Sequence, residues 1–255
     1  MIQSIATIIR QAGEIMLGAQ KPAVYEKEGH ANFVTQTDID VQTFLIEHLH
    51  QLMPEALFLA EEQENLQLTE GLTFVIDPID GTTNFMHSRR ASCISVGLLR
   101  NRQLELAFVY QPWLREMYAA ERGKGAFCND RRLQASNVPF EHAVVNIGTA
   151  PYQPELSSRS MKLAAEFLGR TSDLRRCGSA ALDLCDVAAG GAELFWEMEL
   201  SPWDYAAGAL IVTEAGGKIA TMRGDALVHG TKTSVLASNP ACFEAAVALC
   251  AGAMA

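Results

Sequence analysis

The sequence contains no run of 18 apolar residues, so a conventional membrane-spanning helix is not expected. The segment from Met1 to Leu17 carries Arg10 and Glu14 among its apolar residues. It lacks both the continuous apolar core and the small-residue cleavage site of a signal peptide. We therefore predict no membrane partner and a cytoplasmic location.

Paired cysteine motifs are also missing. The chain has 6 cysteines, but no two form a Cys-x-x-Cys pair, and none has the Cys/His spacing of a zinc site. Disulfide bonds and structural zinc are therefore not expected. Cys185 and Cys250 lie within apolar helical patterns, which predicts that both are buried free thiols.

Basic charge is scarce relative to acidic charge. The chain has 20 Lys and Arg residues against 30 Asp and Glu residues, which gives a net charge of −10. Proteins that bind the phosphate backbone of DNA or RNA usually have the opposite balance, so no nucleic-acid partner is expected. An excess of carboxylates suits a protein that binds hard cations, which prefer oxygen ligands.

The remaining composition is ordinary for a globular enzyme, with 49% hydrophobic and 20% charged residues among 255. No repeat or linker divides the chain, so we predict one domain over residues 1–255 with a soft boundary near 138–142. Apolar periodicity and turn signals predict most of the secondary structure. The expected helices are 2–19, from 35–38 to Pro54, 156–168, from 177–179 to Gly190, from Asp204, and one after Asn239-Pro240; the expected strands are 57–60, 73–76, 92–99, 103–110, 116–120, 144–147, 193–198 and 234–237; residues 20–36 are expected to be irregular.

The most informative stretch is Asp77-Pro78-Ile79-Asp80-Gly81-Thr82-Thr83-Asn84-Phe85. It follows the apolar run 73–76, so Asp77 is expected where that strand ends, with the proline stopping the ladder. The Asp-Gly pair signals a turn, and the Thr-Thr-Asn after it supplies hydroxyl and N–H donors at a short helix start. Either Asp alone would indicate only a turn. Together, two carboxylates beside donors able to hold an anion predict a metal and phosphate site.

Three further acids have two interpretations each. Glu61 and its neighbour Glu62 follow the strand 57–60, and adjacent strands would place Glu61 beside Asp77, although paired acids there are often only a solvated loop. Asp38 either caps a helix or orients a catalytic group, and the cap is favoured on the local sequence alone. Asp204 either complements the helix dipole in the first turn or projects a metal ligand from a fixed element.

These residues together resemble the inositol monophosphatase family of magnesium-dependent, lithium-sensitive phosphatases. The resemblance covers essentially the whole chain and implies a layered α/β/α/β/α sandwich of the inositol monophosphatase and fructose-1,6-bisphosphatase type, usually assembled as a homodimer. The motifs that carry it are Glu61-Glu62, residues 77–84, Trp203-Asp204-Tyr205-Ala206-Ala207-Gly208 and Glu214-Ala215-Gly216-Gly217, with Gly178-Ser179-Ala180-Ala181 and Glu197 fitting the substrate side.

The resemblance implies a set of magnesium ligands. Glu61, Asp77 and the backbone carbonyl of Ile79 would hold one Mg²⁺. Asp77, Asp80 and Asp204 would hold a second, with Asp77 bridging the two. A third, weaker ion near Glu61 occurs in the family, so two or three Mg²⁺ per subunit are expected.

The resemblance also implies catalytic and substrate-binding roles. Thr82 with Glu61 would activate the attacking water, and Asp38 would hydrogen-bond Thr82, which raises Asp38 above a cap-only role. Lys27 matches a family lysine near the metal site. The substrate-binding residues implied are Asp80, Gly81, Thr82, Thr83, Ala180, Glu197 and Asp204, among which the N–H groups of Gly81 and Thr82 would bind the phosphate.

Several functions stay open at this point. Inositol monophosphate is the favoured substrate, because Glu197 precedes Asp204 by the spacing seen in inositol monophosphatases. Other family substrates are sugar or polyol phosphates, fructose 1,6-bisphosphate, histidinol phosphate and 3′-phosphoadenosine 5′-phosphate. A haloacid-dehalogenase-type phosphatase would use a covalent Asp nucleophile in an Asp-x-Asp pattern. Here the spacing from Asp77 through Pro78 to Asp80 is Asp-x-x-Asp, which favours direct attack by water. A non-catalytic regulatory protein that keeps the fold is the alternative of another class.

Overall fold

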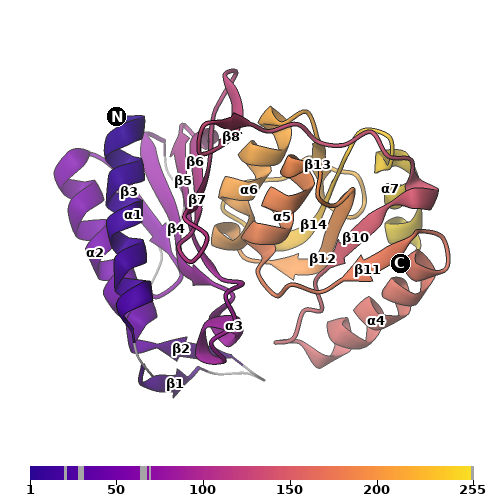
Figure 1. The fold of residues 1–255 in the computed structure, drawn as a ribbon, viewed down its shortest axis with the longest axis horizontal. Coiled ribbons are helices and arrows are strands. Elements are labelled where there is room, and N and C mark those ends of the chain that lie inside the picture. Colours follow the sequence, from indigo (N-terminus) through magenta and orange to yellow (C-terminus); the bar gives the residue numbers. More distant parts are fainter. Residues whose placement is uncertain (20–21, 28–31, 64–67, 69, 254–255) are drawn as a thin grey trace.

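The computed structural model describes residues 1–19, 22–27, 32–63, 68 and 70–253, and its layers alternate between helices and sheets. Figure 1 shows α1 and α2 on one side, a seven-stranded sheet, the pair α5 and α6, a five-stranded sheet, and finally α4 and α7. This order confirms the predicted α/β/α/β/α sandwich. The helices are α1 Ile2–Gly18, α2 Gln36–Leu52, α3 Thr82–Met86, α4 Pro154–Leu168, α5 Ala180–Ala189, α6 Pro202–Glu214 and α7 Phe243–Ala253, with a 3₁₀ turn at Phe140–His142.

The first sheet has the strand order β3-β4-β5-β6-β7-β8-β9, in which β4 to β9 form an antiparallel meander. Its one parallel pair is β3 with β4, in which Ala60 lies opposite Ile76. This pairing places the residues that follow the two strands, Glu61 and Asp77, side by side. The strands are β3 Leu57–Ala60, β4 Leu72–Asp80, β5 Cys93–Arg100, β6 Gln103–Gln111, β7 Glu116–Glu121, β8 Gly125–Cys128 and β9 Arg131–Arg132.

The second sheet has the strand order β11-β10-β12-β14-β13. Strand β10 is parallel to β11 and β12, whereas β14 is antiparallel to both of its neighbours. The predicted soft boundary at 138–142 lies in the segment between β9 and β10 that connects the two sheets. The strands are β10 Val144–Ile147, β11 Asp173–Arg175, β12 Leu194–Leu200, β13 Lys218–Ala220 and β14 Thr233–Ser238.

The central helix α6 explains how two sheets form one body. Its residues are almost all apolar and buried, as expected of a helix covered on every side. One apolar cluster joins Leu99 of the first sheet, both central helices and Val235 of the second sheet. A Cβ atom on Gly208 would lie 2.4 Å from Leu184 Cδ1, so the glycine permits the close approach of α5 and α6.

Two predicted features are wrong. Strand β4 does not end at Asp77 but continues through Pro78 to Asp80, and its pairing with β5 shifts register between Asp77 and Asp80. Such irregular pairing accommodates a proline, which has no N–H to donate.

Residues 20–36 are not wholly irregular, because β1 Val24–Glu26 pairs with β2 Phe33–Thr35. All β1 residues are exposed, so no apolar alternation signals that strand; residues 20–21 and 28–31 lie outside the described part.

The cysteines agree with the prediction. All 6 are free thiols, and Cys185 and Cys250 are fully buried. Within the described ranges, none of the helices combines the length and the apolar character needed to cross a bilayer.

Candidate active site

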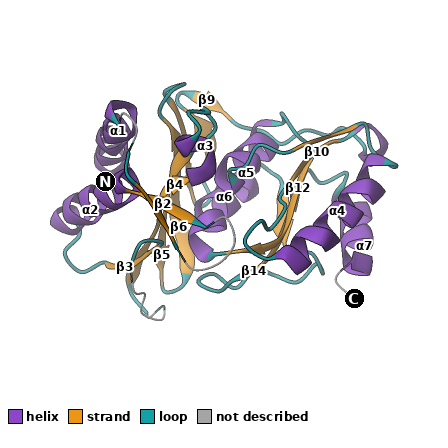
Figure 2. Cartoon of the chain, turned by 90° about the horizontal axis from the view of Figure 1, so that it is seen from below, coloured by secondary structure: helices purple, strands orange, loops and turns teal. Residues whose placement is uncertain are grey.

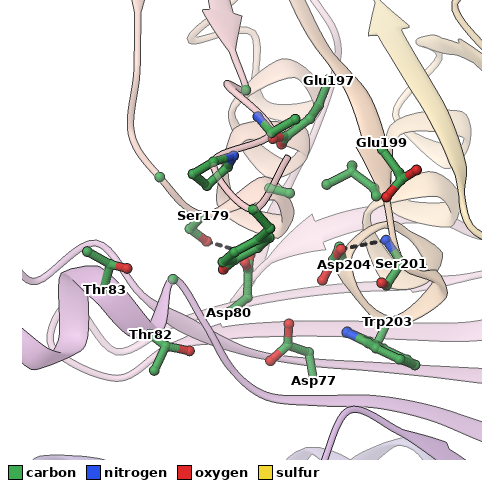
Figure 3. Close-up of a pocket in the computed structure, with 18 of the residues that line it drawn as sticks. Asp77, Asp80, Thr82, Thr83, Ser179, Glu197, Glu199, Ser201, Trp203 and Asp204 are labelled. Carbon is green, nitrogen blue, oxygen red and sulfur yellow. Dashed lines mark hydrogen bonds between the residues drawn. The ribbon is translucent and has the colours of Figure 1, made fainter. Parts of the chain in front are cut away.

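A cavity of about 530 Å³ lies between the two halves of the chain and is lined by residues from both. Figure 2 shows the two sheets in orange with α5 and α6 between them. The cavity wall includes Glu61, Asp77, Asp80 and Asp204, four carboxylates from separate parts of the sequence. In Figure 3 the side chains of Asp77, Asp80 and Asp204 point toward one shared space. The structure therefore brings together the acids predicted as metal ligands.

Asp77 is held at the floor of the cavity. Its side chain is only 2% exposed, and its Oδ1 accepts a hydrogen bond of 3.0 Å from the Ile79 N–H. Burial, together with the neighbouring charges of Glu61, Asp80 and Asp204, raises the pKa of Asp77 well above its ordinary value. An ionised Asp77 is therefore unfavourable here unless a cation lies beside it.

Asp80 connects the two halves. Its Oδ2 accepts hydrogen bonds of 2.6 Å from both the Ser179 hydroxyl and the Ala181 N–H. Burial raises the pKa of Asp80, while these donors oppose the rise. The predicted contact residue Ala180 lies between the two donors, at the first position of α5, and also lines the cavity.

Asp204 is presented by the start of α6. Its Oδ2 accepts a hydrogen bond of 2.7 Å from the Ser201 N–H, in a capping box with that residue. Burial and the charges of Asp80 and Glu61 raise the pKa of Asp204 well above its ordinary value. Asp204 therefore caps the helix start and also lines the cavity, while its role as a metal ligand stays a prediction.

Asp38 and Thr82 are brought together although 44 positions separate them. The Thr82 hydroxyl lies 3.3 Å from Asp38 Oδ1 and 3.1 Å from the carbonyl oxygen of Ile79. Asp38 also accepts a hydrogen bond from the Thr35 N–H, at 2.9 Å, in the capping box of α2. Burial raises the pKa of Asp38 to about 6.

Lys27 supplies positive charge at the edge of the acidic cluster. Its Nζ lies 3.1 Å from Glu61 Oε1 and forms a second ion pair with Glu62. Burial raises the pKa of Glu61, and the Lys27 charge opposes that rise. Lys27 therefore balances part of the negative charge of the cluster.

Gly81 and Thr83 complete the predicted phosphate side, and both line the cavity. Gly81 precedes α3 with a φ of +88°, in the left-handed region that favours glycine. A Cβ atom there would lie 3.0 Å from the carbonyl oxygens of Ala91 and Gly178. The position thus requires glycine for both conformation and space.

Glu197, in strand β12 of the second sheet, lines the cavity and is 8% exposed. Its Oε1 accepts a hydrogen bond of 2.9 Å from the Ala150 N–H. Burial raises the pKa of Glu197 from an ordinary 4.5 to about 7. A Cβ atom on Gly148 would lie 2.0 Å from Glu197 Cδ, so the glycine makes room for this carboxylate.

Replacing Glu197 by Gln is expected to stabilise the protein at high pH. Because the folded-state pKa of Glu197 is raised, its contribution to stability is fully present below about pH 4.5 and is lost as the pH rises through about 7. The amide of the variant would not ionise, so the free energy of unfolding of Glu197→Gln relative to wild type should grow by roughly 3 kcal/mol between pH 4.5 and pH 8. Urea unfolding in EDTA at both pH values measures this.

The exposed Glu141→Gln variant is the control for that experiment and should show no such pH-dependent difference. A difference between the Glu197→Gln variant and wild type that stays constant from pH 4.5 to 8 would contradict a raised pKa for Glu197.

Sequence reasoning missed several residues that line the same cavity. Asp183 is 1% exposed, and its Oδ1 accepts no hydrogen bond from the described residues. Arg176, Tyr152, Glu199 and Lys232 also line the cavity, and Lys232 Nζ lies 3.2 Å from Glu199 Oε1. The sequence carried a signal only for Asp183, which lies three positions after Ala180 and hence on the same helix face.

The donor set of the cavity fits a hard cation. Carboxylate and carbonyl oxygens are the ligands that Mg²⁺ prefers. The hydrogen bonds to Asp77, Asp80 and Asp204 leave lone pairs for an ion, and a divalent cation would relieve their mutual repulsion. Among the described residues, no three acidic, His or Cys side chains form a ready-made metal-binding group. Mg²⁺ usually keeps several water ligands and needs only one or two carboxylates beside them.

Known proteins match nearly the whole chain. The model of the inositol monophosphatase family matches residues 1–253. An inositol-1-monophosphatase of Rhizobium meliloti is 40% identical over 192 residues, covering 74% of this chain and 72% of that protein. A putative Nus factor SuhB of Neisseria meningitidis is 36% identical over 221 residues, covering 85% of each.

Solved structures agree with the sequence matches. The crystal structure of the extragenic suppressor protein SuhB from Bartonella henselae has a TM-score of 0.90 and 31% identity, covering 98% of this chain and 97% of that one. An IMPase of Thermotoga maritima has a TM-score of 0.89 and 29% identity, covering 97% of this chain and 95% of that one. The family match over residues 1–253 and the identity to curated relatives show that this chain belongs to the inositol monophosphatase family.

Proposed function

We propose that this chain is a Mg²⁺-dependent phosphomonoesterase that hydrolyses inositol monophosphate, or a related polyol or sugar phosphate, by direct attack of water. The observation that carries the proposal is the gathering of Glu61, Asp77, Asp80 and Asp204 in one cavity, with the Thr82–Asp38 pair beside them. Membership of a phosphatase family supports the reaction class.

Two or three Mg²⁺ ions would be held by Glu61, Asp77, Asp80, Asp204 and the carbonyl oxygen of Ile79. When bound, Mg²⁺ would lower the pKa of a water molecule and stabilise negative charge on the phosphoryl group. The protein supplies the positions of the ligands, which are fixed by the ends of β3 and β4 and by the first turn of α6.

Thr82, Asp38 and Glu61 would orient the nucleophile. The Thr82 hydroxyl directs its proton toward Asp38 and the Ile79 carbonyl, so its oxygen lone pairs can accept a hydrogen bond from the attacking water. Glu61 would accept a second hydrogen bond from that water. This arrangement needs no covalent Asp intermediate, in contrast to the haloacid-dehalogenase alternative.

Phosphate would lie over the start of α3, where Gly81, Thr82 and Thr83 line the cavity. Gly81 has a left-handed conformation and directly precedes α3. Backbone N–H groups in such a turn are suitable donors to a phosphate oxygen.

The opposite side of the cavity favours a neutral polyhydroxyl group. Arg176 and Lys232 offer donors there, and Asp183, Glu197 and Glu199 offer acceptors. Burial raises the pKa of Glu197 to about 7 and that of Asp183 well above its ordinary value, so these side chains suit hydrogen bonds to neutral hydroxyl groups. A combination of donors and acceptors of this kind suits the hydroxyl groups of inositol.

A panel of substrates tests the proposal. Phosphate release from myo-inositol 1-phosphate, fructose 1,6-bisphosphate, histidinol phosphate and 3′-phosphoadenosine 5′-phosphate is measured with Mg²⁺, with Mg²⁺ and Li⁺, and with EDTA. We expect the highest kcat/KM for inositol phosphate, inhibition by Li⁺ and no turnover in EDTA. A preference for the nucleotide would overturn the substrate assignment, and no phosphate release from any compound would overturn the phosphatase itself.

The regulatory alternative is tested by the same panel, because a protein without catalysis would release no phosphate. One similar protein is named a putative Nus factor, so a regulatory role in this chain remains a candidate beside catalysis. The presence of every predicted acidic ligand in one cavity favours the enzyme.

The family resemblance implies a quaternary structure, and the cytoplasm is the location expected from the sequence. The proposal includes a homodimer in the cytoplasm. Its partner is a small phosphate ester, and it has neither a nucleic-acid nor a membrane partner. Light scattering after size exclusion tests the dimer: a mass near 27.8 kDa would contradict it.

A further inference from the structure

The loop between β10 and α4 forms one wall of the cavity. All of its residues from Gly148 to Gln153 except Thr149 line the cavity. Tyr152 is 54% exposed and is one of these lining residues. The motifs that carry the family resemblance of this sequence do not include Tyr152, and the proposed mechanism does not use it.

Two carboxylates of β12 hold this loop. Glu197 Oε1 accepts a hydrogen bond of 2.9 Å from the Ala150 N–H, and Glu199 Oε1 accepts one from the Gln153 side-chain amide. The pairing of β12 with β14 is irregular between Glu197 and Leu200, and in this stretch both carboxylates reach the loop. The position of Tyr152, between Ala150 and Gln153, is thereby fixed from both sides.

Ala150 shows that the loop conformation is enforced. It is 5% exposed and has a φ of +43°, a region that residues other than glycine rarely adopt. Its carbonyl oxygen accepts hydrogen bonds of 2.8 Å from the Ser157 hydroxyl and 3.0 Å from the Gln153 N–H. Backbone strain of this kind persists where the surroundings over-determine it, often beside a functional site.

Tyr152 faces the acidic wall across the cavity. Partial burial of the phenol, followed by the charges of Glu61 and Asp204, raises the pKa of Tyr152, so its hydroxyl stays protonated. The structure gives this hydroxyl no hydrogen bond within the described residues. An aromatic ring with one polar end, placed over a polar cavity, is suited to cover a ligand that has both apolar and hydroxyl surfaces.

We propose that Tyr152 is a specificity-determining residue whose ring packs against the C–H face of a cyclic alcohol, so that the site prefers cyclic polyol and sugar monophosphates to acyclic ones. The phosphate end of the substrate would lie toward Thr82 and the alcohol toward Glu197, and Tyr152 lines the same cavity. This inference rests on the proposed phosphatase function.

The test compares two substrates and two variants. Tyr152→Ala is expected to raise KM for myo-inositol 1-phosphate about tenfold with kcat within twofold, because ring packing is lost but the reacting groups are untouched. For the acyclic glycerol 2-phosphate, kcat/KM should change less than twofold. Tyr152→Phe keeps the ring and should stay within threefold of wild type on both substrates. The melting temperature checks folding.

Three results would overturn the proposal. Equal losses on both substrates would indicate a general structural role, no change on either would exclude contact, and a Phe variant as impaired as the Ala variant would assign the effect to the hydroxyl. In each of these three cases wild type would still hydrolyse glycerol 2-phosphate in a Mg²⁺-dependent manner. The results would therefore contradict the role of Tyr152 and not the proposed phosphatase function. If wild type hydrolyses neither substrate, both proposals fail.

Discussion

Replacing Asp77 by Asn should reduce Mg²⁺-dependent phosphate release at least a thousandfold, about 4 kcal/mol in the activation barrier. Asp77 lies between Glu61, Asp80 and Asp204 and is the carboxylate proposed to bridge two ions. An amide keeps the size and one oxygen but removes the charge that binds a divalent cation. Phosphate release from the preferred substrate, measured at saturating Mg²⁺, provides the test.

The same variant is expected to be more stable than wild type without metal. A buried carboxylate surrounded by like charges destabilises the fold, and Asn removes that cost, by about 1–3 kcal/mol. Thermal unfolding in EDTA should therefore show a higher melting temperature for Asp77→Asn. Asp130→Asn, in an exposed turn, is the control and should alter neither activity nor stability. Activity within tenfold of wild type, or a variant that is both inactive and less stable, would contradict the role given to Asp77.

Adding Mg²⁺ should stabilise the wild-type protein against heat. A ligand that binds only the folded state adds about 2.7 kcal/mol when present at 100 times its Kd. For a chain of this length that corresponds to a rise in melting temperature of roughly 5–10 °C. Differential scanning calorimetry with increasing MgCl₂, at ionic strength held constant with NaCl, measures the rise.

The Asp77→Asn variant is the matched comparison for that titration. Its melting temperature should respond much less to Mg²⁺, since two ion positions lose a shared ligand, whereas Asp130→Asn should respond as wild type does. An equal response in Asp77→Asn would mean that the stabilising ions bind elsewhere.

The sequence predicted the first-sheet part of the site because that part depends on local geometry. Glu61 and Asp77 follow two short apolar runs, and parallel pairing of Ala60 with Ile76 sets them side by side. Asp204 was recognisable from its place in the first turn of a helix. The contact between Asp38 and Thr82 was implied by family resemblance, since local patterns alone favoured a cap.

Contacts between the two halves could not be predicted from local pattern. The bonds from Ser179 and Ala181 to Asp80 span about 100 positions and depend on how α5 packs against the first sheet. Tyr152 sits in a loop without periodicity, and its placement depends on Glu197 and Glu199. Strand β4 continues past Pro78 because irregular pairing absorbs the missing donor, an outcome of tertiary structure that overrides the usual effect of proline.

The central claim is that Glu61, Asp77, Asp80 and Asp204 jointly bind catalytic divalent ions. The most direct measurement is anomalous diffraction from crystals soaked in Mn²⁺, a cation that shares the preference for oxygen ligands. We expect at least two anomalous peaks in the cavity, with the Asp77 carboxylate bound to both ions. A cavity without a peak, at a Mn²⁺ concentration that supports turnover, would contradict the account.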